Sequence, residues 1–105
     1  MVTELTILER LLLLGVLPPA GDFTTIKIVR KLRESLSLTE QELAINQVVQ
    51  HDDGRTTWVE TEPKSIDFGA KALETVVKAL EKLDKENKVE ERHLTLFEKF
   101  GLDED

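Results

Sequence analysis

The sequence predicts one mostly helical α+β domain over residues 1–105, with about five helices and a two-stranded antiparallel β-hairpin at about 47–61. A chain of 105 residues has the length of a single domain. Apolar residues recur at helical spacing along most of the chain. The dipeptide Asp53-Gly54 interrupts that pattern, between two segments that contain β-branched residues.

The hairpin prediction depends on Asp53-Gly54, because a type I′ turn needs positive φ at both central positions and these residues tolerate it. A two-residue turn there pairs Val49 with Trp58. The next pair, Val48 with Val59, faces the opposite side of the ribbon. The larger apolar area favours the Trp58 face as the inward one. Val48 and Val59 are then available for a second contact, such as one with another subunit. Trp58 is either a core anchor or a binding hot spot.

We expect the first helix to begin after Thr3 and to end near Leu14 or Gly15, ahead of the helix-breaking Pro18-Pro19. Leucines and Ile7 form its apolar stripe, and its polar face holds three residues, Thr6, Glu9 and Arg10. Leu13 falls on that polar side, so the helix is either buried all round or offers Leu13 to a partner.

The second helix is expected to start at Asp22 or Thr24, either of which can cap it, and to end at about 35–37. A capping box of Thr39 and Glu42 predicts the start of a short third helix, which must end before the hairpin.

A long fourth helix is expected from a cap at Ser65 or Asp67 to about residues 86–87, and a last helix over about 90–100. Residues 102–105 are acidic and are expected to form a frayed tail.

The overall composition excludes several classes of function. The chain contains no cysteine, so disulfides, thiolate metal sites and thiol catalysis are excluded. The apolar stretch 5–17 is too short and too charged to span a bilayer, and no positive charge precedes it as in a secretory signal. A net charge of −7 disfavours binding to nucleic acid and to anionic membranes. We therefore expect a cytoplasmic protein with no membrane partner.

Three cations at helical spacing, Lys27, Arg30 and Lys31, are the candidate residues for binding an anion or an acidic partner, with Arg33 pointing elsewhere. The ordinary interpretation of such a run is a solvated helix face. A helix-turn-helix over residues 24–46 would place carboxylates of its second helix against the phosphates, which disfavours DNA recognition.

The sequence marks no reaction centre. His51 and His93 are the only imidazoles, the glycines are scattered, and no serine has a histidine nearby in sequence. We expect no catalytic residues, no metal and no cofactor, although a hydrolase site assembled from distant residues stays an alternative.

Three segments, 8–19, 23–33 and 96–100, together resemble small uncharacterised proteins of phages and prophages in their general texture. The resemblance implies a host-takeover, counter-defence or virion-accessory role and assigns no residue a function.

These observations predict a small non-enzymatic interaction protein that self-associates into a homo-oligomer. Its candidate interface residues are Leu13, Val48, Trp58 and Val59. The alternatives are a small anion or nucleotide binder that uses the basic helix 27–33, and a nucleic-acid-binding regulator.

Overall fold

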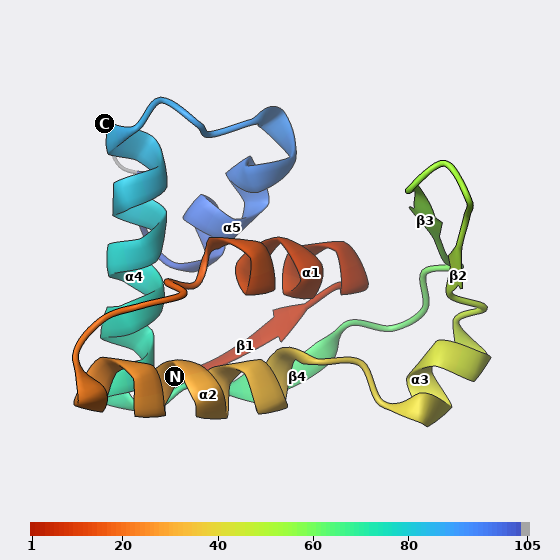
Figure 1. The fold of residues 1–105 in the computed structure, drawn as a ribbon, viewed down its shortest axis with the longest axis horizontal. Coiled ribbons are helices and arrows are strands. Elements are labelled where there is room, and N and C mark those ends of the chain that lie inside the picture. The colour runs from red at the N-terminus through yellow and green to blue at the C-terminus, as the bar shows by residue number, and fades with distance from the viewer. Residues whose placement is uncertain (104–105) are drawn as a thin grey trace.

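The computed structural model describes residues 1–103 and confirms the α+β fold class (Figure 1). Five α-helices accompany two separate two-stranded antiparallel sheets in this part of the chain. In chain order the elements are β1 (Val2–Leu5), α1 (Ile7–Val16), α2 (Phe23–Leu36), α3 (Glu40–Ile45), β2 (Val49–Gln50), β3 (Thr56–Thr57), β4 (Lys64–Asp67), α4 (Ala70–Lys85), the 3₁₀ turn η1 (Glu91–His93) and α5 (Leu94–Lys99).

The sheet formed by β1 and β4 is the main departure from the sequence prediction. Thr3 pairs with Ile66 in its antiparallel register. Residues expected to start a helix or to cap one therefore lie in strands. Each strand is four residues long and about sixty positions from its partner, so local periodicity carries no sign of the pairing. The helices start later than predicted, α1 after its N-cap Thr6 and α4 after Gly69.

The predicted caps of the second and third helices are confirmed. Asp22 accepts a hydrogen bond from the Thr25 amide at 2.7 Å at the start of α2. At the start of α3, Thr39 and Glu42 form both hydrogen bonds of the capping box.

The core lies where α1, α2 and α4 meet over the β1–β4 sheet. The helix α5 packs on the core from the side of α1 that is opposite to the sheet (Figure 1). Phe68 and Phe100 pack edge to face there, with ring centroids 5.3 Å apart. Leu13 is fully buried in this core, so its assignment as an interface residue is wrong. The helix α1 is covered by α2 and α4 as well as by β1, and this leaves its supposed polar side buried too.

The last predicted helix is split into η1 and α5, and Gly101 follows it at a φ of +73°. Leu102 packs against the core, and its amide donates to the Phe97 carbonyl at 2.8 Å. Of the expected frayed tail, residues 104–105 lie outside the described part of the chain.

The hairpin forms at the predicted place, but its register is shifted by one residue. Val49 pairs with Thr57, not with Trp58. The Gly54 amide donates to the His51 carbonyl at 3.0 Å, and Gly54 alone in this turn has a positive φ. This is a type I turn closed by a left-handed glycine, which makes a three-residue loop in place of the two-residue one.

The shift changes which side chains face the protein. A slip of one residue reverses the face of one strand relative to the other. Trp58 is half-buried, whereas Val49 is exposed, so the predicted shared inward face does not form.

Candidate functional site

Residues 40–61, comprising α3, β2, β3 and their loops, project from the rest of the molecule, and we refer to them as the arm (Figure 1). Large apolar side chains are exposed on the arm. Their exposed fractions are 40% for Leu43, 69% for Ile45, 48% for Val49 and 52% for Val59. The other exposed large hydrophobic residues are spread over the rest of the chain: Met1, Val2, Phe23 and Leu94. The arm is therefore where exposed apolar surface is concentrated.

The arm is attached to the body through the fully buried side chain of Arg10. Its Nε donates to the Leu36 carbonyl at 3.0 Å, and its Nη2 donates to the Ser37 carbonyl at 2.8 Å. The same guanidinium binds both carboxylate oxygens of Glu42 in α3. One side chain of α1 thus fixes the end of α2 and the start of the arm together.

Glu42 is strongly acidic in this position. Hydrogen bonding to Arg10, assisted by the Thr39 amide, lowers the pKa of Glu42 to about 2 against the opposing effect of burial. The ammonium of Lys64 lies 4.0 Å from the same carboxylate and acts in the same direction. The ion pair with Arg10 is therefore present throughout the neutral range.

A second set of hydrogen bonds holds the base of the hairpin. The buried Asn46 donates from Nδ2 to the Val59 carbonyl at 2.9 Å and to Thr61 Oγ1 at 2.8 Å. The Val59 amide donates back to the Asn46 carbonyl at 2.6 Å. These contacts fix the backbone of Val59 while its side chain stays exposed.

Glu60 joins the hairpin to α1 and positions the tryptophan. One carboxylate oxygen accepts from the Ile7 amide at 3.1 Å, and the other accepts from Trp58 Nε1 at 2.9 Å. Trp58 is half-buried, and Val48, also half-buried, lies at the other side of the hairpin base. Three of the predicted interface residues thus lie on the arm, Val48, Trp58 and Val59.

The sequence pattern assigned Glu9 and Arg10 to a solvated face, and the structure buries both. Burial opposes ionisation of Glu9, but hydrogen bonds from Lys99 and the Thr6 amide leave its pKa below the usual value. Lys99 Nζ lies 2.7 Å from this carboxylate and also donates to the Glu4 carbonyl. A charged pair thereby fastens α5 to α1 and β1.

The predicted anion-binding cations do not converge on one site. Lys27, Arg30 and Lys31 are all exposed on α2, and none is in an ion pair within residues 1–103. Lys27 lies over the Phe23 ring, 5.3 Å from its centroid. Only Arg30 of the three lines a shallow hollow of about 440 Å³, and there it is joined by Arg33, which was expected to point elsewhere.

The two histidines have structural partners. His51 Nε2 lies 2.8 Å from Thr57 Oγ1 across the hairpin, and His93 Nδ1 accepts from the Glu90 amide at 2.9 Å. Within residues 1–103, no three His, Asp or Glu side chains are grouped so as to hold a metal ion, and no helix has the length and apolar character needed to cross a bilayer. Comparisons with protein-family models, curated proteins and solved structures find no match to this chain.

Proposed function

We propose that the protein is a non-enzymatic binding protein that self-associates through the apolar surface of the arm. The observation that carries the proposal is the concentration of exposed Leu43, Ile45, Val49 and Val59 on one projecting segment. Single exposed apolar residues are common on protein surfaces, but a group of them on one projecting segment is typical of an interaction site.

A second copy of the chain is the partner that this surface favours. A two-fold dimer places the same patch of each subunit against the other, so an apolar arm meets an apolar arm. Among residues 1–103, the two short strands of the hairpin pair only with each other, so each also has an open edge. The contacts of Arg10 with Glu42 hold the arm on the body, and those of Asn46 fix the base of the hairpin within the arm. Both order the arm before association, which reduces the entropy lost on binding.

The net charge of the chain opposes this association, so the effect of salt on self-association is a test of it. The chain has a net charge of −7, so two copies repel each other at low ionic strength. Added salt screens that repulsion while leaving apolar contacts intact. Self-association through the arm should therefore strengthen as salt is raised.

Sedimentation velocity over a range of protein concentrations tests the proposal. The expected result is a concentration-dependent dimer that is lost in the variants Ile45→Lys and Val49→Lys. Leu94→Lys is the matched control, because Leu94 is exposed to a similar degree but lies on α5. A strictly monomeric wild-type chain, or an equal effect of all three substitutions, would refute association through the arm.

The hollow between the Pro18-Pro19 turn and α2 supports a second candidate function, binding of a small anion or a nucleotide. Arg30 and Arg33 both line it with Glu34, which leaves one positive charge in excess, and guanidinium groups suit phosphate oxygens. The variant Arg30→Glu should abolish any thermal stabilisation by nucleotides, whereas Lys31→Glu, outside the hollow, should keep it. Absence of a shift with wild-type protein excludes this candidate.

A nucleic-acid-binding regulator is the least favoured of the candidate functions. The exposed cations of α2 are too few to offset the net negative charge of the chain. The phage-related role that the sequence resemblance implies is compatible with a self-associating binding protein and stays a prediction.

A further inference from the structure

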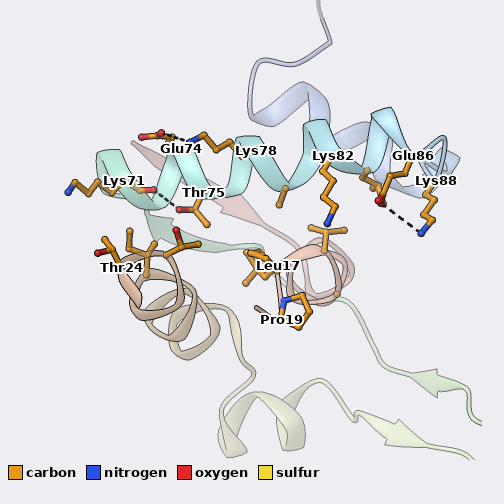
Figure 2. A pocket seen from close by; sticks show the side chains of 17 residues that line it. Leu17, Pro19, Thr24, Lys71, Glu74, Thr75, Lys78, Lys82, Glu86 and Lys88 are labelled. Atoms are coloured by element: carbon orange, nitrogen blue, oxygen red, sulfur yellow. Dashed lines mark hydrogen bonds and ion pairs between the residues drawn. The ribbon is translucent and has the colours of Figure 1, made fainter. Parts of the chain in front are cut away.

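A groove of about 630 Å³ lies between α2 and α4, beside the turn that follows α1 (Figure 2). This volume is typical of a site for a small molecule. The apolar residues that line it are Val16, Leu17, Pro18, Pro19, Ile28, Ala79 and Leu83. In Figure 1 the helix α4 stands at the opposite side of the molecule from the arm, so the groove is separate from the proposed interface.

The charges around the groove are predominantly positive, in contrast to the protein as a whole. Four lysines and two glutamates line it, which leaves an excess of two positive charges in a chain of net charge −7. Each glutamate is already neutralised by a lysine: Glu74 lies 2.9 Å from Lys78, and Glu86 lies 3.8 Å from Lys88. The excess therefore belongs to the other two lysines.

These two lysines, Lys71 and Lys82, form no ion pair within residues 1–103 and differ in position. Lys82 extends from the last turn of α4 toward the end of α1, across the groove, whereas Lys71 lies at its outer end (Figure 2). A single cation is thus available above the apolar lining. This arrangement is complementary to a ligand with one negative charge and an apolar chain.

We propose that the groove binds a small amphiphilic carboxylate, whose carboxylate pairs with Lys82 and whose aliphatic chain lies along Ile28, Ala79 and Leu83. Burial of the chain supplies most of the affinity. The ion pair, partly exposed to solvent, supplies selectivity for an anionic head group. The volume is large enough to hold a chain of this kind, so we take a free amphiphile as the occupant.

Titration of the protein with decanoate, followed by amide NMR spectra, tests the proposal. The expected result is saturable shifts of amides that line the groove, such as Gly15, Ala79 and Leu83, below the concentration at which decanoate forms micelles. Charge reversal in Lys82→Glu should weaken binding by about tenfold. The control Lys85→Glu makes the same charge change on the same helix outside the groove and should leave binding unchanged.

Two further measurements separate the contributions of head group and chain. Decyltrimethylammonium has the same chain with a positive head group and should not bind. Ala79→Phe fills the apolar lining and should abolish decanoate binding while the fold, checked by the amide spectrum, is kept. Shifts centred on the arm, shifts that appear only with micelles, or equal affinity in Lys82→Glu and Lys85→Glu would each overturn the proposal.

Discussion

Arg10 is buried because its planar guanidinium finds four acceptors at once, two backbone carbonyls at the end of α2 and both oxygens of Glu42. A buried charge is tolerated when it is paired and its remaining donors are satisfied. Lysine cannot reproduce this geometry, since its ammonium is a point charge without the fork that binds a carboxylate bidentately.

Replacing Arg10 with Met should therefore lower the free energy of unfolding by about 3 kcal/mol, because it leaves two carbonyls without a donor and Glu42 without its paired guanidinium. Urea denaturation measures the loss. Arg10→Lys should recover only part of it. Arg30→Met, which removes an exposed arginine, should change stability little. Equal stabilities of the two methionine variants would show that the buried network contributes nothing.

The depressed pKa of Glu42 makes stability depend on pH in a defined interval. Its ordinary value is 4.5, and in the folded protein it is about 2. A group whose pKa falls on folding contributes stability above its unfolded value and loses that contribution as the pH drops through the folded one. The wild-type protein should thus lose this stabilisation between pH 4.5 and about 2.

Comparison with Glu42→Gln isolates this contribution from the other carboxylates. The wild type should exceed the variant by about 2 kcal/mol at neutral pH, since hydrogen bonds to a charged group are the stronger ones. The difference should shrink steadily below pH 4.5 and nearly vanish by pH 2. A difference that is constant across this interval would contradict the assignment.

At the scale of elements, the β1–β4 ladder explains how the first residues of the chain are held against residues 64–68. The backbones of Met1 and Phe68 exchange two hydrogen bonds. In an antiparallel ladder, hydrogen-bonded and non-hydrogen-bonded residue pairs alternate. Thr3 and Ile66 therefore form the next hydrogen-bonded pair, and Glu4 and Ser65 form a non-hydrogen-bonded pair.

A proline at Thr3 should therefore remove a ladder hydrogen bond, whereas a proline at Glu4 should not. We expect Thr3→Pro to lower stability by about 2 kcal/mol and Glu4→Pro to lower it much less. Thermal denaturation of the two variants provides the comparison. The same loss in both would mean that β1 does not pair in the register that places Thr3 opposite Ile66.

Elements whose signals are local were predictable from sequence. The cap at Asp22 and the capping box at Thr39 are short patterns that act through neighbouring backbone amides. Thr6 and Glu9 form the same kind of box at the start of α1, and its spacing is visible in the sequence. Recognising it would have placed the helix start correctly and given Glu9 a structural role.

Contacts between distant residues were not predictable. The pairing of β1 with β4 and that of Arg10 with Glu42 each join segments far apart along the chain. For the candidate site, the sequence placed Val48, Trp58 and Val59 on a hairpin, but it could not give the register, because one extra loop residue leaves the composition of the strands unchanged. Nothing in the local pattern distinguished a buried Leu13 from an exposed one.

At the scale of the whole molecule, the structure consists of a packed body and an arm that adds few apolar side chains to the core. Its attachment to the body depends on the bonds that Arg10 donates to Glu42 and on the bond that Glu60 accepts from the Ile7 amide. Segments with few buried apolar contacts open at lower free energy than the core. The arm should therefore open locally while α4, which contains the buried Val76 and Leu80, stays folded.

Native-state hydrogen exchange at two protein concentrations tests this together with the proposed association. In dilute solution the amides of His51 and Val59, which donate within the arm, should exchange at lower opening free energy than those of Val76 and Leu80. At high concentration the arm amides should gain protection, because dimerisation stabilises only the closed arm, and the α4 amides should be less affected. Protection that is uniform across the chain would show one cooperative unit, and protection of the arm that ignores concentration would argue against its role as the interface.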